Sequence, residues 1–269
     1  MSGRSLAAVA AVALAVCGCG GSASAIASQT APAPSSSTLQ AKFAPNKLGA
    51  YSTIEVGFHL YRPGGALPPP LTAVDFLLPT GVSLTTSNLG LDDCDQQMVE
   101  SKGAEGCLAD SVMGYGNATM VAPTQVEGVI EPAGLTVFEA PPIERHTTLM
   151  FEASGNAPVI SEAVILGQML TASAPYEGNL STNFPLTPGL PGENDVSVVS
   201  MYAAIGPKGV TYYHYIHGQR VPYKPQGVVI PSHCPAGGFP FGAKFQFADG
   251  SSESLSTTSP CPHSSGSHG

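Results

Sequence analysis

The clearest pattern in this chain is an alternation of apolar and other positions near its C-terminal end. The apolar side chains recur at every second position: Phe239, Phe241, Ala243, Phe245 and Phe247. A strand with this period buries one face and leaves the other in water. Asp249-Gly250 follows at once and favours a tight two-residue turn, because glycine adopts a positive φ without strain. The pattern therefore predicts a β-hairpin.

Similar signals recur along the chain between glycine and proline residues. STIEVGFHLY, residues 52–61, alternates cleanly and predicts a half-buried strand. Two nearly continuous apolar segments, 158–170 and 196–206, fit either a doubly covered strand or a helix, and their valine-rich composition favours strands. A dozen or so short strands predict an all-β fold, a β-sandwich of one or two lobes, with the best lobe boundary near GENDVSV.

Residues 91–107 differ in character, because their polar composition favours a short helix. Asp92 or Asp93 is a suitable N-cap, and Gly103 would stop the helix after Lys102. Cysteines stand on both sides of this helix. We therefore expect one short helix that a disulfide pins to the sheet.

The first residues resemble an export signal, with Arg4 before an apolar run too short to span a bilayer. Cleavage after Ala25 or Ala27 would release a free protein, whereas a lipoprotein signal would lipidate Cys19. Both interpretations place the mature chain outside the cytoplasm, and no later run is suited to cross a membrane. We predict a signal peptide over 1–27, a disordered Pro/Ser linker over 28–38, the β-sandwich domain over 39–262 and a flexible tail over 263–269.

Four cysteines remain in the mature chain, and an oxidising compartment favours disulfides. Proximity favours Cys94 with Cys107 and Cys234 with Cys261. A zinc site is the rival interpretation, but the spacing matches no C-x2-C pattern. The sequence thus predicts two disulfides, no metal site and no cofactor.

Charge narrows the classes of partner. Removal of the leader with Arg4 leaves nine basic and nineteen acidic side chains, a formal net charge of −10. This balance repels nucleic acid and anionic lipid surfaces. We expect an envelope or extracellular ligand instead.

The best candidate ligand surface lies in and after YYHYIHG, where rings and cations gather in an acidic chain. The candidate residues are Tyr213, Tyr215, His217, Arg220 and Tyr223, with Lys224 beside them. Aromatic rings stack on sugars or aromatic ligands, and guanidinium can hold an anion. His214 and His217 would point to opposite faces of a strand, which argues against a shared metal ion. Tyrosines are also common in ordinary strands, so a purely structural role stays open.

Other chemistry has weaker support. Asp92, Asp93, Asp95 and Glu100 lack the spacing of a calcium loop, and no G-x-S-x-G or H-E-x-x-H motif occurs. We therefore expect an exported, non-enzymatic protein that binds or has a structural role at the cell envelope or in the medium. The alternative is an extracellular hydrolase acting on carbohydrate through an Asp/Glu pair, which requires a concave cleft with two carboxylates roughly 5–10 Å apart.

Several blocks of the sequence resemble uncharacterised exported proteins of soil actinobacteria. These blocks are FAPNKLGAYSTIEVGFHL, P-P-P-L…LLPTG, C…GC…MGYGNA and CPAGGFPFGAKFQFADGS…PCP. The resemblance covers most of the mature chain and implies a secreted β-rich fold, but no activity and no functional residue. The chain departs from the pattern at Cys107, which is followed by Leu108 where the family has proline.

Overall fold

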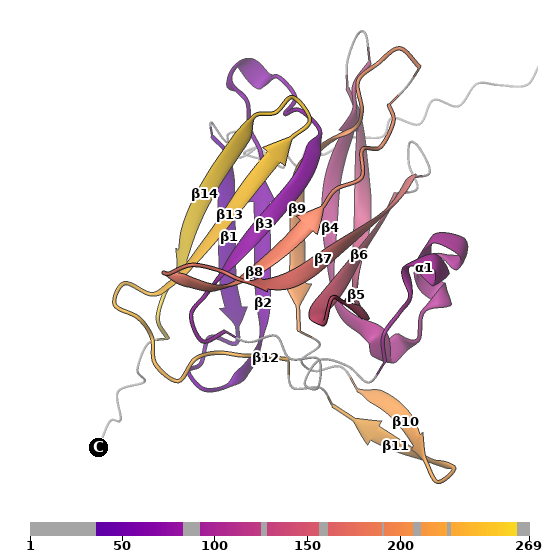
Figure 1. The fold of residues 1–269 in the computed structure, drawn as a ribbon, viewed down its shortest axis with the longest axis vertical. Coiled ribbons are helices and arrows are strands. Elements are labelled where there is room, and N and C mark those ends of the chain that lie inside the picture. Colours follow the sequence, from indigo (N-terminus) through magenta and orange to yellow (C-terminus); the bar gives the residue numbers. More distant parts are fainter. Residues whose placement is uncertain are drawn as a thin grey trace, which may run out of the picture. The chain divides into compact units, whose positions relative to one another are not determined.

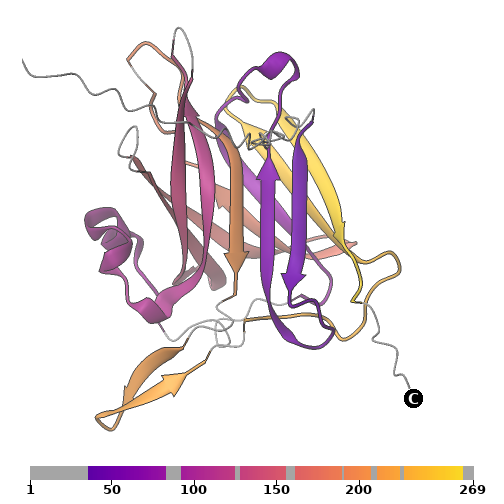
Figure 2. The ribbon, with the colours of Figure 1, turned by 180° about the vertical axis from the view of Figure 1, so that it is seen from behind.

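The structure, a computed structural model, is built on one large antiparallel sheet and a separate two-stranded hairpin (Figures 1 and 2). It describes residues 36–82, 92–124, 128–155, 161–189, 191–206, 211–224 and 227–262. The strands are β1 (Thr38–Ala44), β2 (Tyr51–His59), β3 (Leu71–Pro79), β4 (Val112–Ala122), β5 (Val129–Ile143), β6 (His146–Gly155), β7 (Ser161–Thr171), β8 (Tyr176–Asn183), β9 (Ser197–Ile205), β10 (Tyr212–Ile216), β11 (Gln219–Tyr223), β12 (Val228–Val229), β13 (Phe239–Phe247) and β14 (Ser252–Ser259). The helices are α1 (Gln96–Lys102) and the 3-10 turns η1 (Pro63–Gly65), η3 (Ala104–Gly106) and η4 (Ala109–Ser111).

The large sheet has twelve strands and is nearly closed into a barrel. Its order is β1-β2-β9-β4-β5-β6-β7-β8-β3-β13-β14, with β12 added beside β2. The two end strands, β1 and β14, come into contact. The predicted β-sandwich is therefore wrong in its architecture, although the all-β class is confirmed. Alternation predicts one buried face in a sandwich and in a barrel alike. Which of the two architectures forms depends on which distant strands pair.

Side chains bridge the seam between the end strands. The ring of Phe43 on β1 packs against Phe239 and Phe241 on β13, with ring centroids 5.3 and 5.6 Å apart. Nearby, the Asn46 side-chain amide donates a hydrogen bond of 2.8 Å to the Pro260 carbonyl oxygen. Aromatic packing thus holds β1 against β13, the neighbour of the other edge strand, although the two strands lie near opposite ends of the chain.

The interior of the barrel is apolar, as the predicted alternation on β13 requires. All five alternating residues from Phe239 to Phe247 are buried, whereas Lys244 and Gln246 between them are exposed. Both nearly continuous apolar segments form strands, β7 and β9. The strands on either side of the proposed lobe boundary, β8 and β9, belong to the same sheet.

The C-terminal hairpin has a three-residue loop where two residues were predicted. The Phe247 backbone N–H donates to the Ser251 carbonyl, and Phe239 pairs with Ser259. Ala248 and Asp249 form the turn, and Gly250 follows with a φ of 80°. This is the common loop in which a left-handed glycine completes a turn, so the extra residue shifts the register by one.

The two predicted disulfides are confirmed, Cys94–Cys107 and Cys234–Cys261. Gly237 and Gly238, with φ of 90° and 101°, turn the chain back so that the second bridge can close. Only glycine adopts these values readily. Each bridge restricts the unfolded chain and contributes roughly 3 kcal/mol of stability.

Helix α1 exists as predicted but begins later. Asp95, not Asp92 or Asp93, is the N-cap, because its carboxylate accepts a hydrogen bond from the Gln97 backbone N–H. Gly103 ends the helix as expected. A second apolar cluster lies beneath it on the outer face of β5 and β6 and consists of Cys94, Val99, Phe138, Ala140 and Met150. The helix with its disulfide therefore covers this part of the sheet.

Several predictions concern parts of the chain outside the described residues. These are the signal peptide over 1–27 with Cys19, almost all of the linker over 28–38 and the tail over 263–269. They stay predictions. Among the described residues, no helix is long and apolar enough to span a membrane.

Candidate functional site

The candidate ligand surface is a hairpin made of β10 and β11, which was predicted only as a single strand. His217 and Gly218 form its two-residue turn, with φ of 49° and 78°. Positive φ at both positions matches the twist of a tight hairpin. His217 therefore lies in the turn and not on a strand, which corrects the expectation that His214 and His217 point to opposite faces of one strand. The His-Gly pair was the signal for this turn.

One face of the hairpin presents rings and a cation to solvent, and we call it the hairpin face. Tyr213 pairs with Pro222 and Tyr215 with Arg220, so these four residues share that face. The Tyr213 side chain is 46% exposed and that of Tyr215 is 74% exposed. Figures 1 and 2 show the hairpin projecting from the barrel. The hairpin face is therefore open to a partner.

Arg220 is already stacked in this arrangement. Its guanidinium carbon lies 3.7 Å from the centroid of the Tyr213 ring. Stacking fixes the plane of the guanidinium and leaves its in-plane N–H groups directed away from the ring. A partner therefore meets a cation whose orientation is largely set before binding.

Tyr212 anchors the hairpin to the barrel. Its ring is buried, and its hydroxyl donates a hydrogen bond to the Val112 carbonyl oxygen at the start of β4. Burial, with smaller contributions from Tyr115 and Asp110, raises the pKa of the Tyr212 hydroxyl. The hydroxyl thus stays a donor at all ordinary pH values, and the anchor does not depend on pH.

The structure divides the predicted candidates. Tyr213, Tyr215 and Arg220 come together on the hairpin face, whereas Tyr223 pairs with Tyr212 on the other face and is half-buried. Lys224 follows β11 and is exposed. The sequence reasoning missed Tyr115, a 60% exposed ring on β4 that lies close enough to Tyr212 to influence it. The period of β4 places it on the outside, but no sequence signal brings it near the hairpin.

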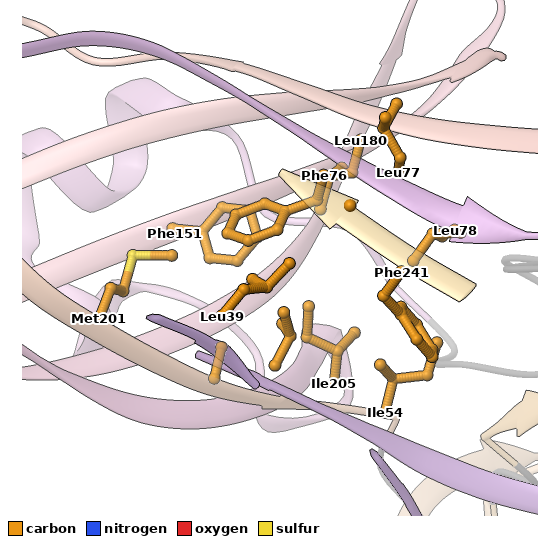
Figure 3. Close-up of a pocket in the computed structure, with 13 residues that line it drawn as sticks. Leu39, Ile54, Phe76, Leu77, Leu78, Phe151, Leu180, Met201, Ile205 and Phe241 are labelled. Atoms are coloured by element: carbon orange, nitrogen blue, oxygen red, sulfur yellow. The ribbon is translucent and has the colours of Figure 1, made fainter. Parts of the chain in front are cut away.

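The interior of the barrel is filled. Figure 3 shows the side chains around a cavity in the apolar core, among them Leu39, Phe151 and Met201. Its volume is about 20 Å³, and its described lining is apolar. This is room for about one water molecule, which would lack polar partners there. This cavity therefore leaves no room for a ligand of ordinary size.

A groove lies on the outer side of the sheet between α1 and strands β7 and β8. Its volume is about 420 Å³, and the described lining carries amides, a hydroxyl and apolar side chains, among them Gln96, Gln168, Asn183, Val164 and Leu170. The described lining has no ionisable side chain. Such a surface can hydrogen-bond a neutral polar group but does not select a charge.

A second open cavity, which we call the end cavity, lies where β4 ends and β9 begins. Its volume is about 560 Å³, and its lining is Leu67, Pro68, Pro69, Pro70, Pro123, Asn194, Asp195, Ser197, Ala248 and Asp249. The Ser197 hydroxyl donates to the Pro68 carbonyl and fixes the proline segment against β9. The end cavity thus combines rigid apolar walls with two carboxylates.

The Asp249 carboxylate is poorly suited to acid catalysis. Hydrogen bonds from the Ser251 hydroxyl and backbone N–H to Asp249 Oδ1 lower the pKa of Asp249, so this group is ionised at neutral pH. A glycosidase needs one carboxyl that stays protonated to act as the general acid. The end cavity is better suited to attract a cation, and the hydrolase alternative stays a prediction.

Raised pKa values occur elsewhere. Burial and the nearby Asp93 carboxylate raise the pKa of Glu139 to about 7, and burial also raises the pKa of Glu152. Neither side chain lines the cavities described above. Among the described residues, no group of three His, Cys, Asp or Glu side chains is placed to hold a metal ion.

The raised pKa of Glu139 predicts a pH dependence of stability. The unfolded carboxyl ionises near its ordinary value of 4.5, whereas the folded one holds its proton up to about pH 7. The folded state therefore binds more protons in this window, and stability falls as the pH rises through it, then levels off. We expect Glu139→Gln to flatten this slope and to be more stable than the wild type at pH 8 in urea unfolding. The exposed Glu105→Gln should keep the slope, and equal slopes in Glu139→Gln and the wild type would contradict the prediction.

Comparisons with known proteins add no family to this picture. No family model, no curated protein and no solved structure matches the chain. The resemblance to exported actinobacterial proteins therefore stays a prediction, and the function has to be argued from the surfaces themselves.

Proposed function

We propose that this protein acts outside the cytoplasm as a non-catalytic binding protein and that the hairpin face is its contact surface. The observation that carries the proposal is the cluster of Tyr213, Tyr215 and Arg220 on one exposed face. Tyrosine and arginine are enriched among residues that dominate binding energy, because they combine large apolar area with directed hydrogen bonds. Rings exposed to water do not stabilise a monomer, so burial against a partner is the simplest explanation for this exposed cluster.

The extracellular setting is part of the same proposal. Two disulfides join the described cysteines, and disulfides persist mainly in oxidising compartments. The leader-like N-terminus and the resemblance to exported actinobacterial proteins support the same setting. We therefore propose a partner at the cell envelope or in the medium. The acidic charge of the chain makes nucleic acid an unfavourable partner.

The test measures binding of the labelled mature protein to envelope preparations from its host. The double variant Tyr215→Ala/Arg220→Ala should bind at least about 10-fold more weakly, because truncating residues of this kind commonly costs more than 1 kcal/mol each. Leu186→Ala, which removes an exposed apolar side chain outside the hairpin, is the matched control and should bind like the wild type. Equal binding of the double variant and the wild type would remove the hairpin face from the proposal.

A further inference from the structure

We propose that one partner of the hairpin face is the end cavity of a second copy of this chain, so that copies associate head to tail. This inference rests on the proposed function, because it uses the same contact surface and names its occupant. We infer a second copy as the occupant because the two surfaces complement each other in position, shape and charge. Each of these points follows from the described residues.

The two surfaces lie at opposite ends of the barrel. Strands β4 and β9 are antiparallel neighbours, with Gly114 paired to Ile205 at one end and Val121 paired to Ser197 at the other. The hairpin follows the end of β9 and is bonded to Val112 at the start of β4. The end cavity is lined by Ser197 and by residues beyond the end of β4. Each copy therefore carries a projection at one end, the β10–β11 hairpin seen in Figure 2, and a cavity at the other.

The apolar parts of the two surfaces match. Pro68, Pro69 and Pro70 form a wall with few internal degrees of freedom, and Leu67 beside them is exposed. Tyrosine rings pack well against such walls, as aromatic grooves that bind proline-rich segments show. The cavity volume of about 560 Å³ falls within the roughly 300–1,000 Å³ typical of sites that enclose a ligand. It has the size to take up the projecting Tyr215 ring.

The charges also match. The end cavity carries Asp195 and Asp249, whereas the hairpin carries Arg220 with the exposed Lys224 just after it. The chain as a whole has nineteen acidic and ten basic side chains, so unspecific contact between copies is repulsive. Contact is favoured where the few cations of one copy meet carboxylates of the next. A guanidinium can bind a carboxylate through two parallel hydrogen bonds, which would fix the orientation.

The contact would be heterologous, because different surfaces of the two copies meet. Such a contact leaves one hairpin and one cavity unoccupied at the ends, so it can add further copies into an open chain or close into a ring. This property makes a complementation experiment possible. A copy with a disabled hairpin still offers its cavity, and a copy with a disabled cavity still offers its hairpin.

The test uses two variants of the mature protein and sedimentation velocity at low ionic strength. Tyr215→Ala/Arg220→Ala disables the hairpin face, and Asp195→Lys/Asp249→Lys disables the end cavity. We expect the wild type to form species larger than a monomer as its concentration rises, and each variant to stay monomeric. An equimolar mixture of the variants should form a species of twice the monomer mass and none larger. Added salt should weaken all of these contacts.

Asp249 accepts hydrogen bonds within its own turn, so its replacement can disturb the loop. The single variant Asp195→Lys avoids this and should also fail to self-associate, while still pairing with the hairpin variant. Circular dichroism and thermal unfolding establish that each variant is folded. A wild type that is monomeric at all concentrations, or a mixture that stays monomeric, would overturn the inference.

The envelope-binding assay separates this inference from the proposed function. Loss of envelope binding in the hairpin variant, with a wild type that stays monomeric, supports a foreign partner and overturns self-association alone. Self-association with envelope binding unchanged in the hairpin variant supports the second copy and overturns the envelope role of the hairpin. The two proposals can therefore fail independently.

Discussion

Phe245→Ala is expected to lower the free energy of unfolding by about 4 kcal/mol. The Phe245 ring on β13 is fully buried, and its centroid lies 5.0 Å from that of Phe58 in an edge-on contact. Truncation removes the transfer free energy of the ring and leaves a cavity between β13 and β2 that the rigid sheet cannot refill. A domain is commonly stable by only about 5–15 kcal/mol, so this one change removes a large share.

Chemical denaturation of the purified variant measures this loss. Gln246→Ala is the matched control, because Gln246 is the next residue of the same strand and faces solvent. An exposed substitution of this kind changes stability by less than about 0.5 kcal/mol. Similar losses in the two variants would show that side-chain burial on β13 does not alternate as described.

Gly116→Ala has the second large expected effect, a destabilisation of about 3 kcal/mol or more. Gly116 on β4 pairs with Ala203 on β9, and a Cβ atom at this position would lie 1.9 Å from the Tyr202 carbonyl oxygen. That oxygen belongs to the backbone, so the two strands would have to move apart. Glycine within a strand often marks such a close approach of another backbone.

Gly134→Ala on β5 is the control for this prediction. A Cβ atom there would have no neighbour nearer than the Ser154 carbonyl oxygen at 3.9 Å. Alanine should therefore be tolerated and can stabilise the protein by up to about 1 kcal/mol, since it restricts the unfolded chain. Thermal unfolding should rank Gly134→Ala at or above the wild type and Gly116→Ala well below it. The reverse order would contradict the close approach of β4 and β9.

The sequence was most informative for features that depend on residues close together along the chain. Alternation alone identifies the buried face of β13, because side chains of a strand point to opposite sides in turn. Chain proximity was enough for both disulfides, and Gly103 marked the end of α1. The N-cap was misplaced because Asp92, Asp93 and Asp95 all satisfy the same local preference. Which of them caps depends on where the disulfide and the sheet hold the segment.

The barrel could not be derived in the same way. β9 lies between β2 and β4, and β3 lies between β8 and β13, so strands pair across long stretches of sequence. Local alternation carries no information about such pairing, and it is the same in a sandwich and in a barrel. The contact of β1 with β14 decides between the two and follows only from the complete set of pairs.

The candidate surface, too, could be predicted in its local composition but not in its three-dimensional arrangement. The composition around Tyr213, Tyr215 and Arg220 could be recognised directly from the sequence. The assignment of these residues to one face required the turn at His217-Gly218, which sets the register of the hairpin. The end cavity was not predicted, because its prolines and aspartates come from four separate connections that meet only in the folded chain.

The seam between β1 and β14 has a consequence for the order of folding. Strand β1 pairs with β2, the next strand along the sequence, but its other side meets β14 near the far end of the sequence, so the Phe43 ring gains its contacts with Phe239 and Phe241 only when β13 is in place. Contacts this distant along a polypeptide make folding slow, because a large loop must close, at a cost in conformational entropy, before the contacts can stabilise the folded chain. If the chain is exported N-terminus first, in line with the proposed extracellular setting, this side of β1 stays uncovered until β13 and β14 have also emerged from the translocation channel.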